Sequence, residues 1–143
     1  MKFAMYTLCF LLCLNTTVDS RKSLLCHKWK QIGLKQFGKA FKPVDASMAE
    51  IITLKTDGTY EELLYGSLQI GGVWKFDADS AKLAFALTSM GGTPRASLPL
   101  EKTKPTDSIL RLTADTLIYG SLAYYGPENV YGHDDWYFVR DGD

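Results

Sequence analysis

From residue 50 to the end of the chain, short β-prone runs alternate with turns rich in Asp, Gly and Ser. One pair of runs covers residues 51–64 and turns at Asp57-Gly58. Another covers residues 72–87 and turns at Asp77-Ala78-Asp79-Ser80. Turns of this composition tolerate the positive φ that tight hairpins need. Consecutive hairpins with no helix between them predict an all-β antiparallel meander.

The strands can be placed approximately from their apolar positions. They are predicted at residues 24–32, 50–55, 59–65, 71–77, 82–88, 108–113, 116–124 and 133–140. The segment Lys82–Thr88 alternates most clearly, with Leu83, Phe85 and Leu87 on one face, as in a half-buried strand. About eight such strands must close or stack to hide their edges, so we expect the strand around Trp29 to pair with the one around Trp136.

Two segments do not fit the strand pattern. Residues 35–48 have no clear period, and we expect a strand extension, a loop and one turn of helix at 45–50 that Asp45 could cap. Residues 90–105 contain Gly91, Gly92 and three prolines, which exclude a central strand. We expect this long loop to frame one end of the molecule together with residues 124–127, and to act as a lid.

The first twenty residues have the composition of a secretory signal peptide. Lys2 precedes an apolar run over residues 3–14, and Val18-Asp19-Ser20 provides a cleavage site after Ser20. The run is short for a membrane span, which needs roughly 20 residues, so a membrane anchor is the less favoured alternative. Lipidation at Cys13 is also disfavoured, because bulky leucines precede that cysteine. We therefore predict a signal peptide over 1–20 and one exported domain over 21–143, located outside the cell, in the periplasm or in the cell envelope.

Charge and cysteine content narrow the classes of partner. The formal net charge is zero, with 16 basic and 16 acidic residues, so there is no basic field to hold a nucleic acid. Cys26 is the one cysteine within 21–143. That domain can therefore form no internal disulfide and no Cys-x-x-Cys metal framework, and it must depend on its core for stability.

Three features together resemble the small bacterial lipocalin-like domains. They are the Trp-Lys pairs at Trp29 and Trp74, the Asp57-Gly58-Thr59-Tyr60 hairpin, and the run over 109–117. The resemblance covers about residues 24–140, although His27 stands where that family has the Gly of its Gly-x-Trp motif. It implies an up-and-down eight-stranded lipocalin-like barrel, with Trp29 near the closed end.

The sequence contains few residues arranged as in known catalytic or metal-binding motifs. The chain has no Gly-x-Ser-x-Gly elbow, no phosphate-binding glycine loop and no His-Glu-x-x-His motif. Cys26 and His27 would point to opposite faces of a strand, and His133-Asp134-Asp135 lacks the ligand spacing of a calcium loop. We therefore predict no enzyme activity, no cofactor and no metal site.

The aromatic residues carry most of the functional information. An eight-stranded barrel is either filled by side chains or holds one small ligand. We predict that Trp74, Phe85, Tyr124 and Tyr125 contact a small apolar or amphipathic ligand, which is what the resemblance implies. The main alternative is a structural or interaction module with a filled core and a protein partner in the cell envelope. An enzyme of unrecognised type is the third class.

Overall fold

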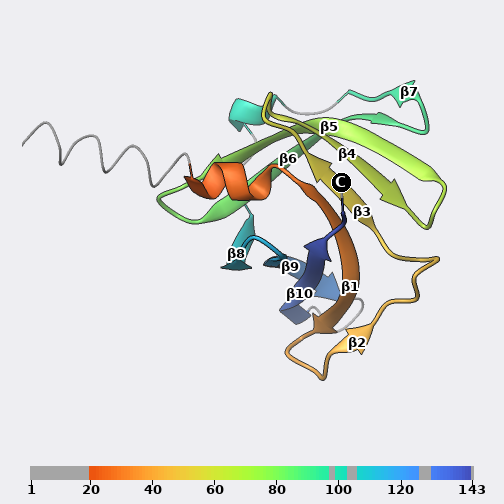
Figure 1. Cartoon of the computed structure of the whole chain (residues 1–143), viewed down its shortest axis with the longest axis vertical. Helices are drawn as coiled ribbons and strands as arrows, with labels where there is room; N and C mark the ends of the chain where they lie inside the picture. The colour runs from red at the N-terminus through yellow and green to blue at the C-terminus, as the bar shows by residue number, and fades with distance from the viewer. Residues whose placement is uncertain (1–19, 97–98, 103–105, 126–129, 143) are drawn as a thin grey trace, which may run out of the picture.

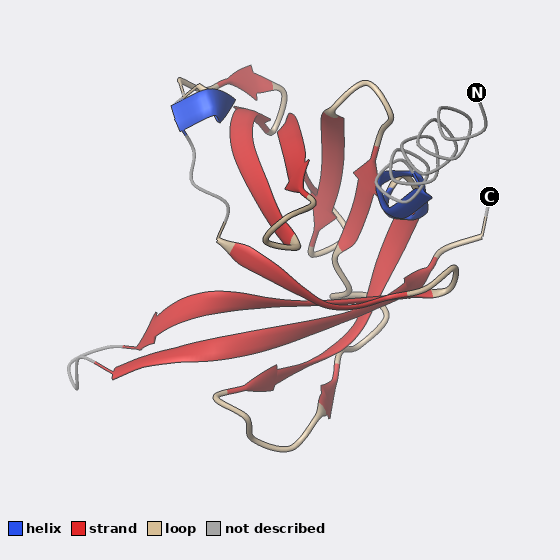
Figure 2. Cartoon of the chain, turned by 90° about the vertical axis from the view of Figure 1, so that its left-hand side faces the viewer, coloured by secondary structure: helices blue, strands red, loops and turns tan. Residues whose placement is uncertain are grey.

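The protein is a closed antiparallel β-barrel. The computed structural model describes residues 20–96, 99–102, 106–125 and 130–142. Around the barrel the eight strands are β1 (Lys28–Gln36), β3 (Ile51–Leu54), β4 (Thr59–Leu64), β5 (Leu68–Asp77), β6 (Lys82–Met90), β8 (Asp107–Leu112), β9 (Thr116–Tyr125) and β10 (Val130–Arg140) (Figures 1 and 2). Each strand pairs with the next along the chain, so the predicted up-and-down order is confirmed.

Pairing between the first and last strands closes the barrel, as predicted. β10 pairs with β1 over most of their length, with Gln31 opposite Phe138 and Leu34 opposite Trp136. The register shifts between Gln31 and Gly33, which is a β-bulge. Ile32, the residue within the bulge, is 40% exposed, and after the bulge Leu34 lies opposite Trp136, which lines the barrel interior.

The predicted hairpin turns are present and are held by side-chain hydrogen bonds. Asp57 Oδ1 accepts hydrogen bonds from the backbone N (2.9 Å) and the Oγ1 (2.7 Å) of Thr59, and Gly58 has φ 84°. In the turn between β8 and β9, Thr113 Oγ1 accepts from the backbone N of Thr116 at 3.0 Å. These local contacts explain why turn composition alone located the hairpins.

One end of the barrel is covered by a helical turn that the sequence did not predict. Residues 20–25 are helical, and β1 begins at Lys28 rather than at residue 24. Leu25 is fully buried, and its carbonyl oxygen accepts a hydrogen bond from Trp29 Nε1 at 2.9 Å. Lys22 Nζ lies 5.9 Å from the centre of the Trp74 ring. The strand predicted from residue 24 is therefore wrong at its start, because Leu25 packs across the end of the barrel and not along its wall.

The irregular segment before β3 contains no helix. A two-residue strand, β2 (Lys42–Pro43), pairs with β1, and residues 46–48 form only a turn. The Asp45 side chain does accept a hydrogen bond from the Ser47 backbone N at 2.8 Å. The predicted cap residue therefore stabilises a turn instead of a helix.

The described part of the long segment after β6 packs on the outside of the barrel. β6 continues to Met90 and pairs with β7 (Thr93–Pro94), and a 3₁₀ turn, η1, spans Leu100–Lys102 (Figure 1). The outward-facing Lys75 donates a hydrogen bond from Nζ to the Leu100 carbonyl oxygen at 3.0 Å. Residues 97–98 and 103–105 lie outside the described residues, so the prediction of a lid stays a prediction.

Candidate functional site

The barrel wall has the least pairing between β6 and β8. These strands pair at two positions only, Lys82 with Ser108 and Leu83 with Asp107. The backbone N of Ile109 also donates to the Ala81 carbonyl oxygen at 2.8 Å. Beyond Leu83 no further pairing with β8 is present in the described residues, and the two strands lie apart (Figure 1). The hydrogen-bonded pairing of the wall is thus interrupted beside Asp107 and Phe85.

An interior cavity of about 240 Å³ lies next to this interruption and is accessible to solvent. Its walls come from β3, β4, β6, β8, β9 and β10. The residues that line it are Glu50, Ile52, Tyr60, Glu62, Phe85, Asp107, Tyr119, Ser121 and Trp136. The barrel therefore has a central space that its side chains do not fill, and this space has polar and aromatic walls.

Two glutamates form a carboxyl pair on one wall. Glu62 lies opposite Ile52 in the β3–β4 register, and Glu50 lies two residues before Ile52 on the same face. A side-chain hydrogen bond joins Glu50 and Glu62. Burial, followed by the nearby Glu62 charge, raises the pKa of Glu50 to about 8, and burial also raises the pKa of Glu62. Two carboxyls this close hold a proton between them at neutral pH, because both cannot carry charge cheaply.

A third carboxyl faces the cavity from the strand at this interruption. Asp107 is the first residue of β8 and lies opposite Leu83 of β6. Its Oδ1 accepts a hydrogen bond from Thr106 Oγ1 at 3.1 Å. Burial raises the pKa of Asp107, and this effect outweighs the hydrogen bond, which lowers it. An acid with a raised pKa in a cavity is a frequent feature of functional sites.

Two buried tyrosines complete the polar surface. Tyr60 is 5% exposed and Tyr119 is 8% exposed. The Tyr60 ring meets the edge of Phe85, with ring centres 5.2 Å apart, and Tyr119 stacks on Phe138 at 5.5 Å. Burial raises the pKa of Tyr60 to about 12, with a further contribution from Glu62. In the described part of the chain no hydrogen bond is found to either hydroxyl, which is uncommon for buried tyrosines.

The remaining walls are apolar. Ile52, Phe85 and Trp136 contribute the apolar surface. Trp136 donates from Nε1 to Ser121 Oγ at 3.0 Å, which satisfies the indole nitrogen without using a carboxyl. The cavity therefore offers acidic and hydroxyl groups beside aromatic rings, an arrangement suited to a small amphipathic molecule.

Of the four residues that the sequence predicted to contact a ligand, one lines the cavity, one does not, and two have side chains outside the described residues. Phe85 lines the cavity. Trp74 is buried under the helical turn, where its Nε1 donates to the Lys55 carbonyl oxygen at 3.1 Å, and it is not among the cavity-lining residues. Tyr124 and Tyr125 end β9 opposite Tyr131 and Val130, and their side chains lie outside the described residues. Their contact with a ligand stays a prediction.

Sequence analysis missed the three carboxyls, Glu50, Glu62 and Asp107. The adjacent pair Glu61-Glu62 reads as two solvent-facing charges, yet strand alternation puts Glu61 outside and Glu62 inside. The available signal was the i, i+2 spacing of Tyr60 and Glu62, which places an acid on the same face as a core aromatic.

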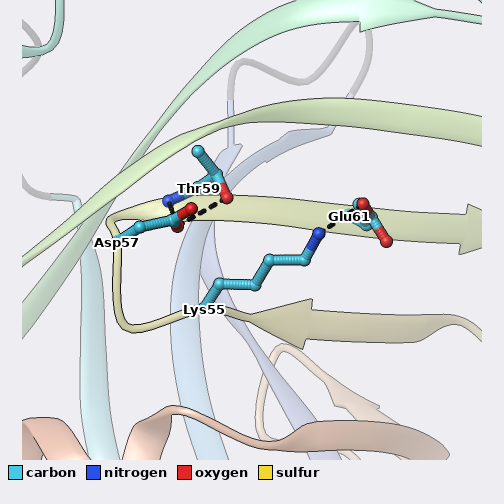
Figure 3. A network of polar contacts seen from close by, with 4 residues as sticks. All are labelled: Lys55, Asp57, Thr59 and Glu61. Atoms are coloured by element: carbon cyan, nitrogen blue, oxygen red, sulfur yellow. Dashed lines mark hydrogen bonds and ion pairs between the residues drawn. The ribbon is translucent and has the colours of Figure 1, made fainter.

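A larger hollow of about 520 Å³ lies mostly on the outer face of β3, β4 and β5. Of the charged residues that line it, Glu62 also lines the interior cavity, and Lys28 and Glu61 have ionic partners. Lys28 Nζ lies 2.7 Å from Asp141 Oδ2, and Glu61 pairs with Lys55 beside the Asp57–Thr59 turn (Figure 3). Since these charges neutralise one another in solvent, the outer hollow makes a weaker case for a specific ligand than the interior cavity does.

Other candidate chemistry gains no support from the geometry. Burial raises the pKa of the Cys26 thiol, which keeps the nucleophilic thiolate scarce. Within the described ranges, no three His, Cys, Asp or Glu residues are grouped so as to hold a metal ion. The same ranges contain no helix with the length and hydropathy needed to cross a membrane.

These observations define a closed eight-stranded β-barrel with a polar and aromatic interior cavity. The sequence matches no protein-family model and no curated protein. The barrel fold is consistent with the lipocalin-like resemblance.

Proposed function

We propose that this protein is a lipocalin-like binding barrel that holds one small amphipathic molecule in its interior. The observation that carries the proposal is the cavity beside the interrupted β6–β8 pairing. It is accessible, and three carboxyls and two tyrosines line it beside aromatic rings. These polar groups face a space that a bound molecule could occupy, and they would fix its orientation by hydrogen bonds.

The size of the cavity restricts the ligand. At about 240 Å³ it is smaller than the roughly 300–1,000 Å³ typical of sites for drug-sized molecules. Long-chain fatty acids, retinoids and haem are therefore poor candidates, and a ligand with a single ring is a better one. Its apolar part would contact Phe85 and Trp136 and leave water at about 25 cal/mol per Å².

The alternative is a structural or interaction module of the cell envelope with a filled core. That reading gains support from exposed apolar side chains such as Leu110 (55%) and Leu122 (59%). It requires no cavity, however, and gives no reason for acids and tyrosines to face the barrel interior. An enzyme is disfavoured because no nucleophile and base are paired around the cavity.

We also propose that the barrel works outside the cytoplasm. The apolar run over residues 3–14 and the cleavage pattern ending at Ser20 support export. The zero formal net charge supports a small molecule as partner rather than a nucleic acid.

Calorimetric titration of residues 21–143 with small single-ring compounds of positive, zero and negative charge tests the binding function. Trp136 lies in the cavity wall, so its fluorescence provides a second readout. Ser121→Leu should fill the cavity and abolish binding. Leu122→Phe changes the next residue of β9, which is 59% exposed, and should leave binding unchanged. If no compound binds the folded protein, the binding function is wrong.

A further inference from the structure

The cavity has an unbalanced charge. Three carboxyls line it, from Glu50, Glu62 and Asp107, and no Lys, Arg or His is among its lining residues. The outer surface is different, because there Lys28 pairs with Asp141 and Lys55 with Glu61. Interior acids without a cation to neutralise them cost stability, and a bound cation would reduce that cost.

A second observation points to a ligand among these acids. Tyr119 is buried, with 8% of its surface exposed, and it lines the cavity from β9. The same cavity is lined by Glu50, Glu62 and Asp107, so the Tyr119 side chain and the three carboxyls share one space. No hydrogen bond joins it to any of them in the described residues. The cavity that Tyr119 and the carboxyls share has a volume of about 240 Å³, which is enough for a small ligand.

We propose that the ligand is a small organic cation, in which a primary or secondary ammonium group lies among Glu50, Glu62 and Asp107 and an apolar or aromatic body lies against Phe85 and Trp136. This inference rests on the proposed binding function and names the chemical class of its ligand.

The geometry favours an organic cation over a metal ion. The carboxyls stand on separate walls and, in the described residues, form no group that could hold a metal. An ammonium group can donate to one or two of these carboxyls and be attracted by the third across the cavity, whereas a metal ion needs several oxygens in direct contact. The aromatic rings favour a cation with an apolar body, since ring faces attract positive charge.

Binding of a cation should release a proton. The pKa of Glu50 is about 8 in the free protein, so this carboxyl is protonated at neutral pH. The titratable groups that face it are Glu62 and Tyr60 from β4, Asp107 from β8 and Tyr119 from β9. None of these groups is basic, so an ammonium would be the first positive charge in the cavity and would lower the pKa of Glu50.

Three matched probes separate charge from shape. Phenethylamine, 2-phenylethanol and phenylacetate have similar sizes and carry positive, zero and negative charge near pH 7. Titration calorimetry on residues 21–143 should give an affinity for the amine at least about tenfold higher than for the alcohol. Repeating the amine titration in buffers of different ionisation enthalpy should reveal release of a proton.

Two substitutions from different strands test the carboxyls. Glu62→Gln and Asp107→Asn each keep the side-chain shape, and each should weaken amine binding by about tenfold to a hundredfold while leaving alcohol binding nearly unchanged. Glu61→Gln is the matched control, because it removes the same charge from the outer face of the same strand. It should not change amine affinity. Far-UV circular dichroism and thermal unfolding verify that each variant is folded.

The possible outcomes distinguish the two proposals. Tight binding of the amine that both inner variants weaken supports the inference. If the alcohol binds as tightly as the amine, or binds while the amine does not, the barrel binds small molecules but the ligand is not a cation. Failure of all three probes with folded protein contradicts both the binding function and the inference.

Discussion

At the scale of single residues, Glu50 makes stability depend on pH. Its pKa is about 8 in the folded protein and near 4.5 in an unfolded chain. Between these values the folded state binds more protons than the unfolded state, so stability falls as pH rises. The contribution is complete below about pH 4.5 and is lost by about pH 8, with a slope of at most about 1.4 kcal/mol per pH unit.

We therefore expect Glu50→Gln to reduce this pH dependence. Wild-type protein should lose thermal stability between about pH 5 and pH 8, and the variant should lose less, since Gln cannot ionise. A slope remains in the variant because burial also raises the pKa of Asp107. Thermal unfolding at several pH values measures the effect. Glu61→Gln should follow the wild type, and equal slopes in wild type and Glu50→Gln would contradict the prediction.

Gly72 is required for the Tyr60 ring to reach its position. An added Cβ at Gly72 would lie 2.4 Å from Tyr60 Cε1 and 2.3 Å from the Ala86 carbonyl oxygen. Gly72→Ala should therefore destabilise the barrel by about 1–3 kcal/mol, as overpacked cores do, and should also disturb the cavity. Denaturant unfolding measures the loss. Gly142→Ala is the control, because no atom lies within 4 Å of its added Cβ, and a loss as large as that of Gly72→Ala would argue against steric overlap.

At the scale of elements, the helical turn over residues 20–25 is part of the core. Leu25 is fully buried, and Trp74 beneath the turn is 2% exposed. Trp74→Ala should cost about 3–5 kcal/mol and Leu25→Ala about 2–5 kcal/mol in denaturant unfolding. Tyr65→Ala, at 62% exposure, should cost little. A loss below about 1 kcal/mol for Trp74→Ala would place its ring outside the core.

The short β6–β8 junction is the element that creates the site. All other neighbouring strands of the barrel pair over longer stretches, whereas β6 and β8 pair at Leu83 and Lys82 only. This junction both exposes the cavity and brings Asp107 to its edge. The proposed ligand would therefore enter at the least paired part of the wall, without opening the rest of the barrel.

At the scale of the whole molecule, export and folding should be linked through the N-terminus. Cleavage after Ser20 would leave Arg21 and the turn that contains Leu25 in the mature chain. N-terminal sequencing of protein recovered from outside the cytoplasm should therefore begin at Arg21. A retained Met1, or a lipid on Cys13, would contradict this. A chain beginning at Lys28 should be much less stable than one beginning at Arg21, because it lacks Leu25.

The sequence by itself determined the hairpins and the barrel. Asp57-Gly58, Asp77–Ser80 and the Thr113–Thr116 turn are local structures. Short-range hydrogen bonds fix all three, and Gly58 adds a positive φ of 84°, so composition was sufficient to find them. Closure of the barrel could also be predicted, because a meander with two unpaired edge strands is unfavourable. Trp29 and Trp136 were correctly assigned to the strands that close it.

Only the tertiary structure decided what the barrel interior contains. Glu61 and Glu62 have the same local sequence features, and the face that each occupies depends on the register with β3 and β5. Glu50, Asp107 and Tyr119 come together from distant parts of the chain because the barrel closes and β6 separates from β8. The helical turn over residues 20–25 could not be predicted from the sequence either. Leu25 is buried there against an end of the barrel that exists only once the barrel has closed.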